Sequence, residues 1–147
     1  MKLAYSVATA EDIPVLYRFC KKLIDDYEDI TTIDYDKVLC WVRRKLELCI
    51  GEYTVISADG RKAGYYHFFR NEDGIPELDD LYLFPEFQNQ GIGSAVIEKC
   101  CDEVLEPVML YVFIRNNRAV SLYQRLGFEI VETIKESRYI MKRTKPA

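Results

Sequence analysis

Residues 78–93 of this chain, L-D-D-L-Y-L-F-P-E-F-Q-N-Q-G-I-G, form the stretch from which the rest of the sequence can be understood. The first part, residues 78–84, is mostly apolar, which is typical of a strand inside a sheet, and Pro85 ends it. The second part places Gly91 and Gly93 where an apolar pattern with helical spacing starts, at Ile92. Because free backbone N–H groups converge where a helix begins, the loop predicts an anion site, typically for phosphate.

Two familiar phosphate loops do not fit this segment. No Gly-Lys-Ser/Thr follows the glycines, so it is not a P-loop, and Val96 stands where the third glycine of a dinucleotide fingerprint would be. A tight turn between strand and helix, without any ligand, is the simpler alternative. What remains is a Gln-x-x-Gly-x-Gly loop, residues 88–93, that follows a strand.

Length and composition favour one domain over residues 1–147. The chain is 49% hydrophobic and 30% charged, as in a soluble globular protein. Its net charge of −4 argues against a nucleic-acid partner, which would be repelled on average. No apolar run reaches the length of a membrane span, and the residues before Glu11 are too few for a signal segment, so we expect no membrane partner and a cytoplasmic location.

The cysteines and the single histidine predict no metal site. The five cysteines contain no C-x-x-C pair, and His67 is the only histidine, so the usual spacing of a Cys/His zinc site is missing. We interpret the cysteines as buried thiols in a reducing cytoplasm and assign no role to His67.

Periodicity predicts a mixed α/β fold with a central, mostly antiparallel sheet and about four flanking helices. Asp34 is expected to cap the second helix, whose basic run Arg43-Arg44-Lys45 suits the C-terminal half of the helix dipole. Asp59-Gly60 predicts a hairpin turn. A buried strand at residues 108–114 is expected to run parallel to the strand at residues 78–84. Other strands are expected at residues 3–8, 53–57, 63–69, 128–134 and 138–142.

Two motifs in the expected order carry a family resemblance. Residues 88–93 resemble the pyrophosphate loop of the GNAT superfamily of acetyl-CoA-dependent N-acetyltransferases. The pattern Asn116-x-x-Ala119-x-x-Leu122-Tyr123-x-x-x-Gly127-Phe128 resembles the second hallmark of that superfamily. The resemblance implies a GNAT-type acyltransferase fold in which the parallel strands splay apart. It also implies an N-acetyltransferase that moves an acetyl group from acetyl-CoA, without a metal, directly to a primary amine in a ternary complex.

The same resemblance implies the cofactor-binding residues. Backbone groups of Leu81, Tyr82 and Leu83 would pair with the pantetheine arm like an added strand. Asn116 would hydrogen-bond the pantetheine, and Tyr123 would reach its sulfur. The family often has Arg or Lys near Asn89 and Gln90, which are neutral here, so we expect phosphate binding to depend more on backbone N–H groups and the helix dipole. The amides that would receive the pyrophosphate belong to Gln88, Asn89, Gln90, Gly91, Ile92, Gly93 and Ser94.

Acyl transfer to an amine needs a base, an oxyanion donor and an acid. Tyr123 is predicted as the acid, because a phenol stays protonated at neutral pH and can donate to a departing thiolate. The oxyanion donor would be the N–H of Leu81. Glu77 matches the place where several GNAT enzymes carry a general base. Asp79, Asp80 or water stay as alternatives, and a polar strand end without catalytic role is the simpler interpretation of all three acids.

The acceptor is predicted from residues 25–36, which contain six acidic residues and no basic one. In GNAT relatives the segment between the first two helices borders the acceptor site, so an acidic rim there would attract cations. We therefore expect a small cationic amine. A solvated polar loop is the simpler reading. An acetyltransferase acting on a protein N-terminus or lysine, a catalytically silent CoA-binding or interaction module, and a homodimer all remain open.

Overall fold

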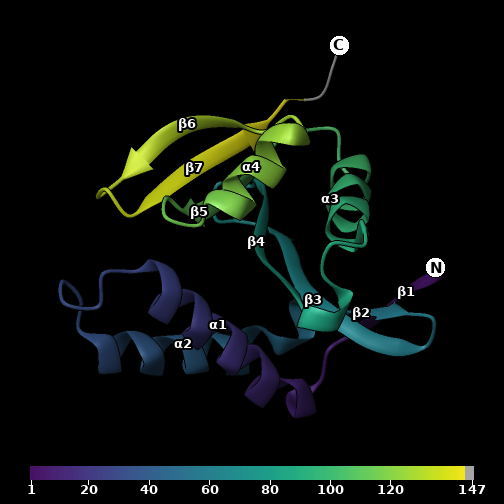
Figure 1. The fold of residues 1–147 in the computed structure, drawn as a ribbon, viewed down its shortest axis with the longest axis horizontal. Coiled ribbons are helices and arrows are strands. Elements are labelled where there is room, and N and C mark those ends of the chain that lie inside the picture. The colour runs from purple at the N-terminus through teal and green to yellow at the C-terminus, as the bar shows by residue number, and fades with distance from the viewer. Residues whose placement is uncertain (145–147) are drawn as a thin grey trace.

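The computed structural model describes residues 1–144 and contains a seven-stranded sheet in the order β1-β2-β3-β4-β5-β7-β6 (Figure 1). The last three residues of the predicted domain 1–147 lie outside the described residues. The strands are β1 Leu3–Val7, β2 Tyr53–Ala58, β3 Arg61–Arg70, β4 Pro76–Leu83, β5 Val108–Phe113, β6 Glu129–Ile134 and β7 Arg138–Arg143. The helices are α1 Ile13–Tyr27, α2 Tyr35–Cys49, α3 Ile92–Asp102 and α4 Asn117–Arg125, with short 3₁₀ helices η1 Ala10–Asp12, η2 Ile50–Glu52 and η3 Pro85–Phe87.

The predicted mixed α/β class and the predicted strand positions are confirmed. Asp34 caps α2 by accepting a hydrogen bond from the backbone N–H of Lys37. Asp59 and Gly60 both have positive φ, 49° and 83°, as a two-residue hairpin turn requires. The position of β7 between β5 and β6 was not predicted, because strand periodicity does not say which strand of the final hairpin pairs with β5.

The one parallel pair in the sheet, β4 with β5, is joined at a single position. Among the described residues Glu77 pairs with Met109, and no further pair follows. Because both strands continue for several residues beyond this pair, their backbones separate toward Leu83 and Phe113. The predicted splay is therefore confirmed.

Helices cover both faces of the sheet (Figure 1). Alternate residues of the central strands point to opposite faces, as Tyr65 and Tyr66 of β3 do. Helices α1 and α2 pack with Tyr65 on one face, and α3 packs with Tyr66 on the other. Within residues 1–144, no helix is long and apolar enough to cross a membrane.

The cysteine prediction is partly wrong. Cys100 and Cys101 of α3 are buried in the core. Cys20 and Cys49 are half-buried, and Cys40 is exposed on α2. Its position in α2 places it outside the apolar face formed by Val42 and Leu46.

Gly64 of β3 lies where any side chain would collide with the backbone of β4. It pairs with Leu83, and a Cβ at this position would lie 1.9 Å from the carbonyl oxygen of Tyr82. Since a backbone atom cannot swing aside, we expect Gly64→Ala to lower the free energy of unfolding by about 3 kcal/mol, the upper end of the usual range for overpacking. Urea denaturation measures this. Gly51→Ala is the matched control, because nothing lies within 4 Å of an added Cβ at Gly51. Equal stability of the two variants would contradict the prediction.

Candidate active site

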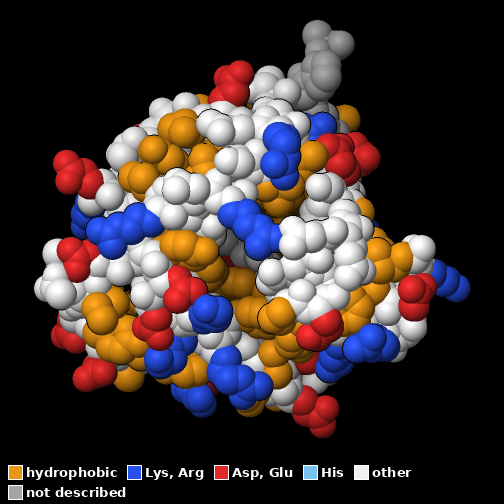
Figure 2. Space-filling model, viewed as in Figure 1, with side chains coloured by type: hydrophobic (Ala, Val, Ile, Leu, Met, Phe, Trp, Pro, Cys, Tyr) orange, Lys and Arg blue, Asp and Glu red, His pale blue; other side chains and the backbone are white. Residues whose placement is uncertain are grey.

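A cavity of about 720 Å³ lies between α1, α4, the end of β4 and the loop that follows it. In Figure 2 it is the hollow near the centre of the molecule, with Lys and Arg side chains at its rim. Of the predicted cofactor-binding residues, Gln90 is not part of the wall. Those that line the cavity are Leu81, Tyr82, Leu83, Gln88, Asn89, Gly91, Ile92, Gly93, Ser94, Asn116 and Tyr123.

The loop between β4 and α3 presents a row of unpaired amides. Asn89 and Gly91 have positive φ, 62° and 81°, which turns the chain sharply into the helix. The side-chain amides of Gln88 and Gln90 donate to the carbonyl oxygens of Leu83 (3.1 Å) and Glu86 (2.8 Å) and so fix the turn. Within residues 1–144, no hydrogen bond is formed by the backbone N–H groups of residues 89–94. They are therefore free for an anion.

Basic side chains supply the charge that the loop itself lacks. The cavity wall contains four of them and one acid, Asp26. The Arg118 guanidinium, at the start of α4, donates to the side-chain oxygen of Asn89 and so lies against the loop. The expectation that anion binding depends chiefly on backbone groups stays a prediction, to which these basic side chains from distant segments add charge. The basic residues are Arg18 and Lys22 of α1 with Arg118 and Arg125 of α4.

Asn116 and Tyr123 lie at the two ends of α4. The side-chain oxygen of Asn116 caps the helix by accepting from Ala119 N–H at 3.2 Å, which leaves its NH₂ group for a ligand. Tyr123 packs edge-on against Phe128, and its hydroxyl makes no hydrogen bond with any described residue. Burial and the negative charge of Asp80 raise the pKa of Tyr123 to about 12. The phenol therefore stays protonated and free to donate.

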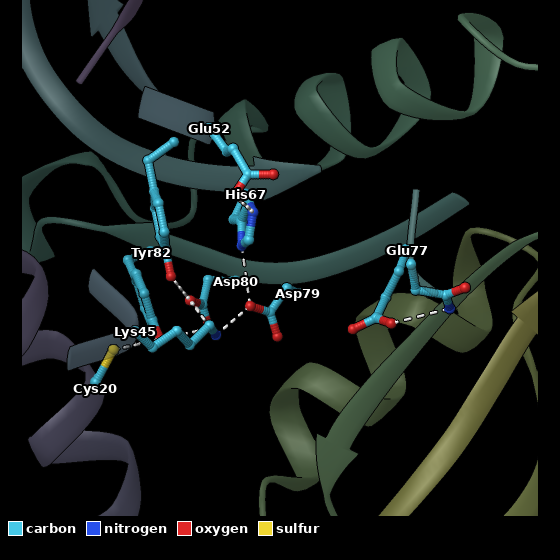
Figure 3. Close-up of polar contacts among 10 residues, drawn as sticks. Cys20, Lys45, Glu52, His67, Glu77, Asp79, Asp80 and Tyr82 are labelled. Atoms are coloured by element: carbon cyan, nitrogen blue, oxygen red, sulfur yellow. Dashed lines mark hydrogen bonds and ion pairs between the residues drawn. The ribbon is translucent and has the colours of Figure 1, made fainter. Parts of the chain in front are cut away.

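Glu77 lies near the start of β4, apart from the other acids of that strand (Figure 3). It is buried, accepts a hydrogen bond from the side chain of Asn71 at 3.2 Å, and has its pKa raised by burial. It does not line the cavity. The assignment of Glu77 as general base stays a prediction, and this position does not favour it.

A β-bulge brings Asp79 and Asp80 to the same side of β4. His67 of β3 pairs with Asp80, but the next residue of β3, Phe68, pairs with Leu78. Asp79 is therefore the extra residue on β4. In a regular strand, neighbouring side chains would point to opposite faces. Here both carboxylates contact the ammonium of Lys45: Asp79 directly, and Asp80 at 3.6 Å.

The two half-buried carboxylates belong to a polar cluster (Figure 3). Asp79 also accepts from Nδ1 of His67 at 3.0 Å, and Asp80 accepts from the hydroxyls of Tyr53 at 2.5 Å and Tyr82 at 2.7 Å. These acids are therefore not a plain polar strand end. Lys45 also departs from the interpretation given to its basic run, since it neutralises two half-buried acids rather than only suiting a helix dipole.

The two neighbouring carboxyls differ in acidity. Burial would raise the pKa of Asp79, but the hydrogen bond from His67 and the charge of Lys45 lower it. Burial raises the pKa of Asp80, and the negative charge of Asp79 raises it further. Of the two, Asp79 is therefore the carboxyl that favours its charged form, and Asp80 is the better proton acceptor.

His67 is held rigidly within this cluster. Its ring is stacked between Tyr53 and Phe69, with centroid distances of 4.5 and 4.4 Å. Because an ionised carboxylate only accepts, Nδ1 carries the proton toward Asp79. His67, Asp79 and Asp80 place ligand atoms within 4.8 Å of one another, but the Lys45 ammonium is the cation that the carboxylates hold. The expectation of no metal stays untested.

The acidic segment is less negative than its sequence suggests. Asp25 and Asp26 form ion pairs of 2.8 Å with Lys21 and Lys22, one helical turn earlier. These local pairs explain two acids whose place near the end of α1 would otherwise be unfavourable. Sequence reasoning missed them because it counted charges only from residue 25 onward.

A smaller cavity of about 190 Å³ lies between the α1–α2 loop and the β6–β7 turn. It shares Tyr27 with the large cavity. Its charged residues are the acids Glu28, Asp29 and Glu136 and the bases Arg115 and Lys135. The small cavity is therefore lined by three acids and two bases.

Comparison with known proteins supports the family resemblance. The acetyltransferase (GNAT) family model matches residues 16–128. An uncharacterized N-acetyltransferase of Methanocaldococcus jannaschii is 33% identical over 73 residues, which are 47% of this chain and 32% of that protein. The thialysine N-epsilon-acetyltransferase of Bos taurus is 41% identical over 54 residues, 34% of this chain and 32% of that protein. The matched segments span about a third of these relatives.

A solved structure extends the likeness to nearly the whole chain. The PaiA N-acetyltransferase of Thermoplasma acidophilum, in complex with coenzyme A, has a TM-score of 0.71 over 99% of this chain and 100% of that chain, at 20% identity. At this identity the likeness concerns the fold. Since the family model matches more than half of the sequence as well, the chain belongs to the acetyltransferase (GNAT) family.

Proposed function

We propose that residues 1–147 form a single N-acetyltransferase domain that transfers an acetyl group from acetyl-CoA to a primary amine in a direct ternary complex. The observation that carries the proposal is the large cavity. Its wall combines amides at the start of α3 and a phenol that have no hydrogen-bond partner among the described residues, together with basic side chains. Phosphates, a thioester and a departing thiolate are the groups of acetyl-CoA that such a wall suits.

The parts of the wall have distinct roles in this proposal. Beyond Glu77 the edge of β4 that faces β5 is unpaired, so main-chain groups of Leu81 and Leu83 would bind pantetheine. The N–H of Phe84 donates to Ala63 of β3, so the main-chain groups of Tyr82, two residues earlier, also face β3, and the predicted part of Tyr82 in this pairing is not supported.

The predicted amide of Gln88 is not free, because it donates to the carbonyl oxygen of Pro85 at 3.2 Å. The amides of residues 89–94 and Arg118 would therefore hold the pyrophosphate. The N–H of Leu81 would stabilise the oxyanion.

Tyr123 would protonate the leaving thiolate. Its pKa of about 12 lies above the pKa of about 8.5 that is usual for a thiol, so proton transfer must be driven by collapse of the tetrahedral intermediate. The elevated pKa also keeps the phenol protonated throughout the range in which amines lose their protons.

For the acceptor we propose a small cationic amine. Asp26 lines the large cavity, and Glu28, Asp29 and Glu136 line the small cavity beside it. These carboxylates would attract an ammonium group, although Lys22, which pairs with Asp26, and the bases Arg115 and Lys135 offset part of their charge.

The CoA site can be tested by thermal denaturation. Ligand that binds the native state raises Tm as its concentration rises. We expect acetyl-CoA to raise Tm of the wild type, and Gly91→Val to abolish the rise because valine disfavours the φ of 81° at this position. Gly60→Val is the matched control. Gly60 has a φ of 83°, with nothing within 4 Å, and lies in the β2–β3 turn outside the cavity wall. Absence of a shift in the wild type would overturn the CoA assignment.

The role of Tyr123 can be tested by Tyr123→Phe. We expect kcat to fall by about 10²–10⁴-fold, as for loss of a general acid, with the Kd of acetyl-CoA little changed. Because the pKa of Tyr123 is raised to about 12, we expect no loss of wild-type activity from its ionisation up to pH 10. Turnover equal to the wild type would show that water protonates the thiolate instead.

The acceptor proposal can be tested by charge removal. Neutralising Asp26, Glu28 and Asp29 together should raise KM for a cationic amine and leave acetyl-CoA binding intact. In the wild type, kcat/KM should fall as salt rises. The control neutralises three exposed acids outside both cavities, Glu47, Glu72 and Asp73, and so changes net charge equally. Preference for an anionic or neutral acceptor, or equal KM in the two triple variants, would refute the proposal.

A further inference from the structure

Tyr82 belongs both to the cavity wall and to the polar cluster around Asp79 and Asp80. Its hydroxyl donates to Oδ1 of Asp80 at 2.7 Å. Asp80 does not line the cavity, and neither do its other polar partners, Lys45 and Tyr53. Within residues 1–144, Tyr82 is thus the hydrogen-bond link between the cavity wall and Asp80. Its ring is fixed by stacking on Phe19, another residue of the wall, at 5.1 Å and 6°.

Asp80 has the surroundings of a proton acceptor. Its pKa is raised by burial and by the adjacent charge of Asp79, while Lys45 and the hydrogen bonds from Tyr53 and Tyr82 oppose the rise without cancelling it. The charge of Asp80 is also felt by Tyr123 on α4. In the part of the chain that the structure describes, seven titratable groups interact or pair with Asp80: Cys20 of α1, Lys45 of α2, Tyr53 of β2, His67 of β3, Asp79 and Tyr82 of β4, and Tyr123 of α4.

Stability alone is a weak reason for this cluster. Burying charges costs solvation free energy that an ion pair often fails to recover, and apolar residues of similar volume are frequently more stable. A bulge that turns two adjacent carboxylates to one side adds like-charge repulsion to that cost. A chemical use of the proton affinity of Asp80 would account for the arrangement.

We propose that Tyr82 and Asp80 form a proton relay that deprotonates the acceptor amine. The acceptor ammonium donates a proton to the phenol oxygen of Tyr82 while the phenol proton passes to Asp80. The ammonium and the carboxylate thereby become a neutral amine and a carboxylic acid, and the phenol is restored. Lys45 and His67 are positioning residues, since they hold Asp79 as the fixed anion beside Asp80.

The protons balance over a full turnover. An ammonium nitrogen that becomes an amide loses two protons. Asp80 takes the first and releases it to solvent before the next cycle. The second proton compensates in the overall count for the proton that Tyr123 gives to the thiolate, so one proton is released to solvent in each turnover. The thiol of Cys20 lies 3.2 Å from the Tyr82 oxygen and remains protonated, because burial raises its pKa to about 12. The phenol oxygen has two lone pairs, so this contact leaves one for the amine.

The proposal rests on the proposed function, and Tyr82→Phe tests it. We measure kcat/KM at pH 7 with an alkylamine, which is mostly charged, and with hydroxylamine, which is mostly neutral. For the alkylamine we expect a loss of about 10²–10⁴-fold, as for removal of a general base. For hydroxylamine we expect little loss, because no proton has to leave before attack. Asp80→Asn should show the same selectivity, and the Kd of acetyl-CoA should not change.

Tyr65→Phe is the matched control. Tyr65 lies in the same core cluster as Tyr82 and donates to a buried carboxylate, Asp12, also at 2.7 Å, but it does not line the cavity. It should lose a similar amount of thermal stability and keep its activity. The relay is overturned if Tyr82→Phe loses no more activity than Tyr65→Phe, or loses equally with both acceptors. If the wild type acetylates no amine at all, the proposed function fails first, and the relay fails with it.

Discussion

The separation of β4 from β5 after the Glu77–Met109 pair is the constraint on which the rest of the structure depends. A sheet that stayed paired would use the main-chain groups of Leu81 and Leu83 internally. Because β5 turns away and pairs on its other side with β7, one edge of β4 stays open in the middle of the sheet. Buried open edges are costly, so this one has to be covered by a ligand or by water. Helices α1 and α4 stand on either side of the opening and turn it into a cavity.

Charge in this cavity is divided between two regions. Arg18, Lys22, Arg118 and Arg125 lie with the loop amides along the wall, where a phosphate chain would need them. The acids Asp79 and Asp80 lie outside the cavity wall, where Asp80 accepts from the hydroxyl of Tyr82, and both are balanced by Lys45. Such a division would let an anionic cofactor and a cationic acceptor approach the same reacting atoms without competing for the same charges.

The features that sequence predicted well are local ones. The loop at residues 88–93, the Asp59-Gly60 turn and the Asp34 cap each depend on residues within one turn of chain, so a short pattern determines them. The features it missed depend on distance in space. Lys45 and Asp79 are 34 residues apart, and no periodicity in α2 indicates that Lys45 reaches β4. The bulge at Asp79 was likewise hidden, since it depends on the register against β3. Arg118 lies inside the second motif, next to the apolar Ala119 and Leu122. A basic residue at that place was the available sign that this helix contributes positive charge to the site.

Two tyrosine–carboxylate hydrogen bonds of equal length show how neighbouring charges determine the proton affinity of a carboxyl group. Tyr65 donates to Asp12 and Tyr82 donates to Asp80, both at 2.7 Å. Burial would raise the pKa of Asp12, but the backbone N–H of Thr9 and the ammonium of Lys62, each at 2.9 Å, lower it. Asp12 is thereby fixed as an anion that ties η1 to β3. Asp80 has Asp79 beside it, and its nearest ammonium is directed mainly at that neighbour. The same tyrosine–carboxylate bond is therefore structural at Asp12, whereas at Asp80 the environment preserves an affinity for a proton.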